Sequence, residues 1–442
     1  MPHFVIKALP FTTRVAHGAK NILAADQARA AKFLSGVHPH GPAAFKARPK
    51  PHHHHHHHHR HANAASGGGG NATSGGGQVE SDPQAPPFAG DSSVDVTDAA
   101  VTYTMSVGVG SPPTQYTLLI DTGSSNTWIG ADKPYNPTST STDTRDAVNV
   151  SYGSGSFTGT EYIDEVTLGP GLVIQSQSIG VASKASGFND VDGIIGIGPV
   201  DLTTSTVKST SSVPTVTDNL FKQGTIPTES IGISFVPTTS ATDAANGELT
   251  FGGTDSSKFT GEISFVPITT TSPASNYGTD GTTILDLTAG IVDTGTTLLM
   301  IATDAFQAYQ QATGATTDST TGLLTVSESQ FENMQSLFFE IGDQTLELTP
   351  NAQIWPRSLN STLGGDNNKI YLIVADMGSN SGSGLDFIDG FGFLQRFYSV
   401  FDTTNSQVSI VLTVLCFFIS NLLPAGRFCH DRVHHGHDQL NE

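Results

Sequence analysis

Two acidic motifs stand out because their residues, taken together, are suited to acid–base chemistry. Asp121 begins an Asp-Thr-Gly triplet in "LLIDTGSSNTWIG", and Asp293 begins the same triplet in "GIVDTGTTLLMI". Each acid follows apolar residues typical of a core strand, where an unpaired carboxylate is very costly. If the two motifs face each other, their carboxylates share one proton. Such a pair can act on a water molecule as general base and general acid.

The elements that position these acids are predicted to be strands. Gly, Ser and Thr are abundant and charged residues are few, and short apolar runs alternate with turn residues, a pattern typical of β structure. A hairpin is predicted over "VTYTMSVGVGSPPTQYTLLID", and helices are predicted only in "NILAADQARAAKFL", "VPTVTDNLFKQG", "ATDAFQAYQQATG" and "SESQFENMQSL".

A second repeat supports two related halves. "DGIIGIG" at 192–198 follows the first acidic motif, and "FIDGFGF" at 387–393 follows the second. A single Asp-Thr-Gly triplet would be weak evidence, because two unrelated strand-to-turn acids can share it. Two copies in matched surroundings favour two halves facing each other about a pseudo-two-fold axis. The glycines of the triplets allow the two backbones to approach closely.

Over residues 95–410 these motifs resemble the pepsin family of aspartic endopeptidases. "GVGSPPTQYTLLIDTGSSNTW" and "FLQRFYSVFDTTN" are most similar to its polyporopepsin-like secreted fungal branch. The resemblance implies an all-β, bilobal pepsin-like fold with pseudo-two-fold related lobes and a central cleft for an extended peptide. It implies Asp121 and Asp293 as catalytic residues, called the dyad below. It also implies a mobile hairpin over the cleft, the flap, formed by Tyr152, Gly153, Ser154 and Gly155. The residues expected to support the dyad are Thr122, Gly123, Ser124, Thr294, Gly295 and Thr296, and Trp128 is expected to support the flap tyrosine.

The function implied by the resemblance is an acid endopeptidase that hydrolyses protein or peptide substrates and is made as a zymogen. No cofactor and no metal are expected, because the dyad activates water directly. A catalytically inactive peptide- or inhibitor-binding relative is the alternative, and loss of either aspartate would favour it. A glycosidase would instead place its two carboxylates in unlike surroundings.

Asp389 departs from the family pattern, which usually has an apolar residue before this glycine. A third acid beside the second catalytic turn would perturb the dyad if it pointed inward. We expect Asp389 to point outward or to be satisfied by partners. The final family strand is also altered, to "VSIVLTV".

The first 90 residues, called the leader below, differ in charge from the rest of the chain. The chain has a formal charge of −20, yet the leader holds 9 of the 20 Lys and Arg residues and 3 of the 40 Asp and Glu residues. An acidic body argues against nucleic acid as its partner. A basic leader is instead expected to dock on the body, and the resemblance implies that it is a removable pro-segment that acts as an intramolecular inhibitor. We expect Lys46, Arg48 and Lys50 to pair with acids of the cleft.

The leader also contains eight consecutive histidines, His52–His59, followed by a Gly/Ser-rich linker. The run is a metal-binding tract, an inserted tag or a solvated spacer. Because histidine titrates near ~6.5, our hypothesis is that this run tunes activation by charging as the pH falls.

Four regions are predicted: the leader at 1–90, an N-terminal lobe at 91–275, a C-terminal lobe at 276–410 and a tail at 411–442. The apolar run at 408–423 has 16 residues, short of the ~20 that span a bilayer, so membrane association is not expected.

No ordinary signal peptide is evident at the start, and a secreted monomer is still expected, with a vacuolar or cell-surface location as the alternative. The only cysteines, Cys416 and Cys429, leave the body without a disulfide, and glycosylation sequons occur at Asn71, Asn149 and Asn360.

Overall fold

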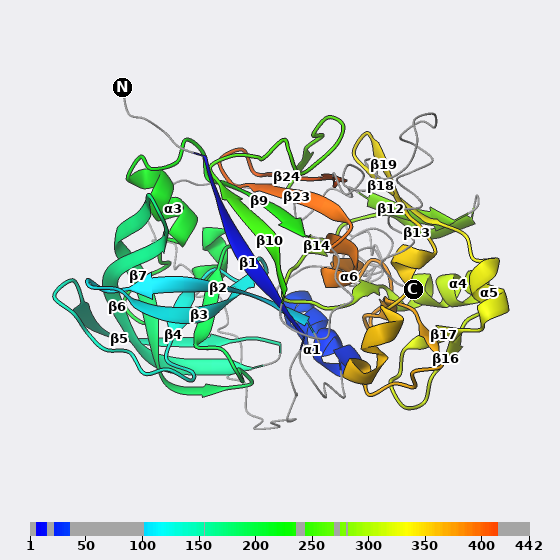
Figure 1. The fold of residues 1–442 in the computed structure, drawn as a ribbon, viewed down its shortest axis with the longest axis horizontal. Helices are drawn as coiled ribbons and strands as arrows, with labels where there is room; N and C mark the ends of the chain where they lie inside the picture. The colour runs from blue at the N-terminus through cyan, green and yellow to red at the C-terminus, as the bar shows by residue number, and fades with distance from the viewer. Residues whose placement is uncertain are drawn as a thin grey trace, which may run out of the picture.

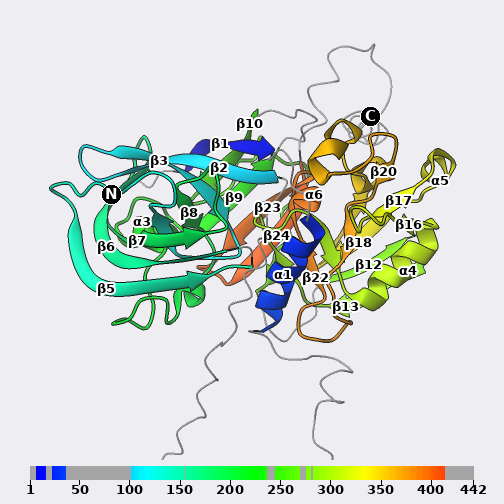
Figure 2. The same cartoon turned by 90° about the horizontal axis from the view of Figure 1, so that it is seen from below.

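The computed structural model describes residues 6–15, 22–35, 101–153, 155–235, 244–268, 275–279 and 282–413. These residues form two lobes built mostly of strands, with helix α1 of the leader lying at the seam between them (Figures 1 and 2). The leader supplies β1 (Lys7–Val15) and α1 (Ile22–Leu34). The predicted all-β, bilobal class is therefore confirmed.

Within its described residues, the N-terminal lobe has nine strands and two short helices. Its strands are β2 (Val101–Val109), β3 (Thr114–Asp121), β4 (Thr127–Ile129), β5 (Thr142–Ser151), β6 (Ser156–Gly169), β7 (Leu172–Ser186), β8 (Gly193–Gly196), β9 (Ser230–Phe235) and β10 (Ala244–Phe251). Its helices are η1 (Val200–Thr203) and α3 (Val216–Lys222).

The remaining elements run from β11 (Val266–Pro267) to the end of the described chain. The strands are β12 (Ser275–Thr279), β13 (Thr282–Thr288), β14 (Ile291–Val292), β15 (Leu299–Ile301), β16 (Thr316–Thr317), β17 (Leu324–Val326), β18 (Leu337–Ile341), β19 (Gln344–Leu348), β20 (Ile370–Tyr371), β21 (Val374–Asp376), β22 (Phe387–Asp389), β23 (Phe397–Asp402) and β24 (Gln407–Leu412). The helices are α4 (Thr303–Thr313), α5 (Glu328–Glu332), η2 (Asn351–Gln353), η3 (Arg357–Leu363) and α6 (Phe391–Leu394).

All four predicted helices are present, as α1, α3, α4 and α5. Two of them begin with a capping box, in which Thr215 pairs with Asp218 before α3 and Ser327 pairs with Gln330 before α5. These reciprocal hydrogen bonds satisfy backbone N–H groups that a helix start leaves without partners. Helix α4 ends at Gly314, whose positive φ of 67° favours glycine. The predicted hairpin is also present, because β2 and β3 pair antiparallel.

One sheet of 13 strands joins the leader, the N-terminal lobe and the end of the chain. Strand β1 lies between β10 and β2, with Leu9 opposite Leu249 and Thr13 opposite Tyr103. On the far side of β10, β9 pairs with β23, which in turn pairs with β24. The last two described strands, β23 and β24, thus belong to the same sheet as the N-terminal lobe. Strand β24 also continues to Leu412, beyond the predicted start of the tail at residue 411.

The two acidic motifs end equivalent strands, which explains the repeat in the sequence. Strand β3 ends at Asp121 and runs parallel to β8, with Asp121 opposite Gly196. Strand β14 precedes Asp293 and runs parallel to β22, with Val292 opposite Asp389. Each later Gly-containing segment therefore lies directly beside the acidic motif of its own half.

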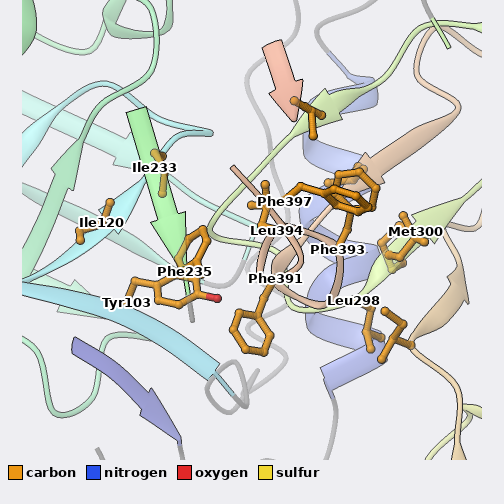
Figure 3. Close-up of a cluster of buried hydrophobic side chains, with 14 of the residues drawn as sticks. Tyr103, Ile120, Ile233, Phe235, Leu298, Met300, Phe391, Phe393, Leu394 and Phe397 are labelled. Atoms are coloured by element: carbon orange, nitrogen blue, oxygen red, sulfur yellow. The ribbon is translucent and has the colours of Figure 1, made fainter. Parts of the chain in front are cut away.

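Aromatic side chains fill the region between the two halves (Figure 3). The ring of Tyr103 on β2 lies 4.3 Å from that of Phe235 on β9 and 5.3 Å from that of Phe391 on α6, measured between centroids. Phe393 lies 4.5 Å from Phe397. Each such ring buries a large apolar area, and the contacts add a smaller geometric preference. This packing gives the acidic turns a rigid support from both sides.

A buried carboxylate organises the outer part of the N-terminal lobe. Asp164 on β6 is fully buried and accepts hydrogen bonds from the hydroxyls of Tyr135, Thr140 and Ser141, at 2.6, 2.6 and 2.7 Å. Burial alone raises the pKa of a carboxyl group, but these donors outweigh it and lower the pKa of Asp164. Asp164 therefore stays ionised and ties the loop after β4 to the sheet.

Candidate active site

The two Asp-Thr-Gly turns are joined by a symmetric set of hydrogen bonds. The N–H of Thr122 donates to Oγ1 of Thr294 at 3.0 Å, and the N–H of Thr294 donates to Oγ1 of Thr122 at 3.0 Å. Each hydroxyl then donates to a carbonyl of the opposite strand, Thr122 to Val292 at 3.2 Å and Thr294 to Ile120 at 3.0 Å. The two turns therefore face each other about a pseudo-two-fold axis.

Both carboxylates lie at this junction and receive matched hydrogen bonds. Asp121 is 3% exposed and Asp293 is fully buried. In each turn the glycine N–H donates to Oδ1 and a hydroxyl donates to Oδ2: Gly123 at 3.0 Å and Ser124 at 2.6 Å for Asp121, and Gly295 at 3.1 Å and Thr296 at 2.6 Å for Asp293. Four donors thus fix the orientation of the two carboxylates.

Arg29 from helix α1 of the leader bridges the dyad. Its Nε donates to Oδ2 of Asp293 at 2.5 Å, and its Nη2 donates to Oδ1 of Asp293 at 2.8 Å and to Oδ1 of Asp121 at 2.5 Å. The guanidinium fits so closely that a Cβ added at Gly295 would lie 2.3 Å from Nη2. Glycine is therefore required here by close approach, and the planar fork of arginine suits a pair of carboxylates.

The two carboxyl groups titrate differently in this closed arrangement. Burial raises the pKa of Asp121, helped by the negative charge of Asp293 and opposed by Arg29. Burial also favours the neutral form of Asp293, but the charge and hydrogen bonds of Arg29, with those of Thr296 and Gly295, outweigh it and lower the pKa of Asp293. Because the two carboxyl groups lie at one junction and share Arg29, they titrate as a coupled pair.

The flap lies against the leader helix. Tyr152 is 8% exposed, and its ring centroid lies 6.5 Å from that of Trp128 and 5.3 Å from that of Phe188. The turn is closed by the N–H of Tyr152, which donates to the carbonyl of Gly155 at 2.7 Å, while Ser154 lies outside the described residues. A Cβ added at Gly153 would lie 2.3 Å from Cα of Arg29. The side chain of Lys32 also donates to the carbonyl of Ser151.

Helix α1 places two further residues against the C-terminal lobe. The carboxylate of Asp26, 2% exposed, accepts hydrogen bonds from the N–H groups of Thr297 and Leu298. Nε2 of Gln27 donates to the carbonyl of Asp376 at 2.9 Å. The helix therefore contacts both Asp-Thr-Gly turns, the flap and β21, and it lies at the seam between the two lobes (Figure 2).

The sequence reasoning missed Arg29 and Asp26, although a signal was present. The buried residues of α1 are Ile22, Ala25, Asp26, Arg29 and Ala30, whose spacing is that of a single helical face. Two charged residues on a buried face need partners elsewhere. The cations that we expected in the cleft, Lys46, Arg48 and Lys50, lie outside the described residues, as does the run His52–His59.

Asp389 is fully buried in β22, so of the two expected alternatives the outward, solvent-facing one is wrong and the one in which partners satisfy the acid remains. Its carbonyl accepts a hydrogen bond from the N–H of Asp293 at 3.1 Å, which links the second acidic turn to its neighbouring strand. Burial of this acid beside the dyad distinguishes the second half of the chain from the first, where the apolar Ile195, opposite Ile120, occupies the equivalent position.

Two features are absent from the described residues. No described helix combines the length and apolar character needed to cross a membrane. Over the same ranges, no cluster of three or more His, Cys, Asp or Glu side chains is arranged to hold a metal ion.

Comparison with known proteins agrees with this geometry. Residues 102–412 match the profile of the eukaryotic aspartyl protease family. The chain is 60% identical over 340 residues to polyporopepsin of Irpex lacteus, covering 74% of this chain and 99% of that protein, and 29% identical over 331 residues to pepsin A of Sus scrofa, covering 70% and 80%. The crystal structure of an aspartic proteinase from Irpex lacteus superposes with a TM-score of 0.69 at 59% identity, covering 71% of this chain and 94% of that one. The chain therefore belongs to the eukaryotic aspartyl protease family, of which pepsin is a member, and is an aspartic endopeptidase.

Proposed function

We propose that Asp121 and Asp293 are the catalytic residues, and that they hydrolyse peptide bonds with a water molecule held between them. The observation that carries this proposal is the reciprocal pair of threonine hydrogen bonds, which holds two buried carboxylates face to face. At this spacing the carboxylates share one proton and titrate as a coupled unit.

In the proposed reaction the ionised member of the dyad removes a proton from the water as it attacks the scissile carbonyl carbon. The protonated member donates to the carbonyl oxygen. The roles then reverse, and a proton passes to the leaving nitrogen as the C–N bond breaks. Ser124 and Thr296 keep the outer carboxylate oxygens in place, and the flap around Tyr152 excludes bulk water.

We further infer that the leader is an intramolecular inhibitor and that the described form is a zymogen. Arg29 occupies the position between the carboxylates where water and the scissile bond would be held. The backbone of α1 lies against Gly153 of the flap, where an extended substrate would lie. Substrate cannot reach the dyad until α1 leaves, and cleavage of the leader then makes the release permanent.

The test is hydrolysis of denatured haemoglobin by the full-length chain after acidification to about pH 3. Activity should appear together with loss of the leader and should be abolished by a statine-type inhibitor. Asp121→Asn and Asp293→Asn should each reduce activity at least about a thousandfold, as expected for removal of one member of a catalytic unit. The matched control is Asp132→Asn at an exposed position, which should keep full activity. Full activity of Asp293→Asn would refute the assignment.

We also propose that the enzyme is a secreted, monomeric glycoprotein. Of the described sequon residues, Asn149 on β5 is exposed. Asn360 is fully buried, and its Nδ2 donates to the carbonyls of Asp366 and Lys369. A glycan at Asn360 would break both hydrogen bonds, so Asn149 is the better attachment site. Intact mass of the secreted protein, with Asn149→Gln compared against Asn360→Gln, tests this.

A further inference from the structure

We propose that Asp26 is a proton-dependent anchor of the leader, which docks best when Asp26 is protonated, so that mild acid tightens the leader against the cleft. Release is then postponed until the medium is acidic enough to protonate the dyad. This inference rests on the proposed function of the leader as an inhibitor, and it assigns a regulatory role to a residue outside the catalytic machinery.

The geometry isolates Asp26 from solvent while placing it next to charge. Its Oδ2 accepts hydrogen bonds from the N–H of Leu298 at 2.8 Å and from the N–H of Thr297 at 3.1 Å, and its Oδ1 lies 3.1 Å from the same Thr297 nitrogen. The charged groups that face it are Arg29 on its own helix and Asp293 on the segment it caps. Two backbone donors are a modest compensation for removing an ionised carboxylate from water.

The balance of these effects favours the neutral form of Asp26 in the docked leader. Burial raises its pKa to about 7, with a further contribution from the negative charge of Asp293, and the two N–H groups and Arg29 only partly oppose the shift. In a released leader, Asp26 is expected near its ordinary value of ~3.9. Because the docked state has the higher pKa, docking takes up a proton between these values, and the docked population grows as the pH falls through that range.

The dyad has the opposite dependence, which sets the lower limit of the closed state. Arg29 stabilises the ionised form of Asp293, whereas the free dyad retains a shared proton. Docking therefore favours loss of a proton from Asp293, and strong acid opposes this ion pair. A neutral Asp26 also removes one negative charge beside Asp293, which favours the ion pair with Arg29. The two sites together predict that the leader is held most tightly at mildly acidic pH.

The experiment measures how firmly α1 is held, using pulsed hydrogen–deuterium exchange on the full-length chain between pH 8 and pH 5. Asp121→Asn is present in every protein compared, so that the leader is not cut during the measurement. After correction for intrinsic exchange rates, protection of the α1 amides should increase about 100-fold from pH 8 to pH 5, the change that linkage gives for the two pKa values. Added Asp26→Asn should reduce that change to less than about threefold.

Two further variants keep the test decisive. Gln27→Ala loses the hydrogen bond to the carbonyl of Asp376 but no titrating group, so it should lower protection equally at every pH. Unchanged protection of β15 and β22 would show that Asp26→Asn does not disturb folding. If it does disturb folding, Asp26→Ser provides a second neutral side chain at this position. Protection that is flat or decreasing toward pH 5 in the parent, or an unchanged increase in both Asp26 variants, would overturn the proposal.

Failure of the inhibitor role would be seen separately. It would appear as hydrolysis of a peptide substrate by the intact chain, without the Asp121 substitution, before any leader is lost. The exchange measurement does not depend on that activity.

Discussion

Arg29 is the residue whose replacement should most directly release the dyad. Arg29→Met keeps a side chain of similar length but removes the charge that lies between Asp121 and Asp293. In the docked leader both carboxylates would then be buried, with their mutual repulsion no longer offset by the guanidinium. The mutation leaves every residue of the proposed catalytic site unchanged.

The expected size of the effect follows from the burial of the three groups. Removing one partner of a buried ion pair costs about 3–5 kcal/mol, because the remaining charge is left uncompensated. Since about 1.4 kcal/mol corresponds to a tenfold change in an equilibrium constant, the released fraction should increase about 100- to 4,000-fold near neutral pH. Uptake of a proton by the dyad will reduce the cost toward the lower value.

Arg29→Lys is the matched control because it keeps the charge but loses the planar fork. Arginine reaches three carboxylate oxygens through two nitrogens, whereas a single ammonium cannot reproduce that planar geometry. We expect release to increase about tenfold for Arg29→Lys, which corresponds to about 1.4 kcal/mol, or roughly one hydrogen bond. The order of release is therefore the parent, then Arg29→Lys, then Arg29→Met.

A fluorescent statine-type inhibitor measures release, because it binds the dyad only when the leader has left. Its apparent affinity at pH 5, recorded before any self-cleavage, should improve by the factors given above. The pKa of Asp293 is lowered in the docked state, so the stabilisation by Arg29 is present at neutral pH and is lost as the pH falls through that lowered value. The difference between Arg29→Met and the parent should thus shrink toward pH 3. Equal affinities at pH 5, or a difference that grows in stronger acid, would refute the reasoning.

Three other changes test separate parts of the structure. Thr294→Val removes a hydroxyl that joins the two acidic turns and leaves one N–H and one carbonyl without that partner. The free energy of unfolding should therefore fall by about 2–4 kcal/mol in urea titrations. A loss no larger than that of Thr316→Val, at an exposed threonine, would contradict this. Asp164→Asn should destabilise the protein by about 2 kcal/mol or more at pH 6. Because the pKa of Asp164 is lowered on folding, that difference should disappear as the pH falls through the lowered value, and a constant difference down to pH 2 would be evidence against the ionised form. Gly153→Ala places a methyl group against the backbone of Arg29 and should speed self-processing at a given acidic pH in a gel time course, whereas slower processing would show that the flap, not the leader, suffers from the added group.

The fold and the dyad were predictable because their signals repeat within the chain. Two strand-ending Asp-Thr-Gly triplets, each followed by a Gly-containing segment, already implied two facing halves, and each triplet lies beside its own segment in the sheet. The helices were readable from amphipathic spacing and capping residues. The lobe boundary at residue 275 remains a prediction. The pairing between β23 and β9 could not be predicted, because these strands are far apart in the sequence.

The contacts of the leader could not be predicted, because charge specifies attraction without specifying position. Net charge indicated correctly that a basic segment precedes an acidic body. It did not indicate which of the nine Lys and Arg residues of the leader contacts the acids of the body. The choice of Arg29 depends on a helical face whose neighbours make space for it, through glycines at residues 123, 153 and 295. The family profile begins at residue 102, so it does not include α1. In the two proposals above, the same helix carries Asp26, which takes up a proton on docking, and Arg29, which favours loss of a proton from Asp293. The proposed inhibition and its pH dependence would then come from residues three positions apart on one face of α1, and separating them experimentally requires substitution of each alone.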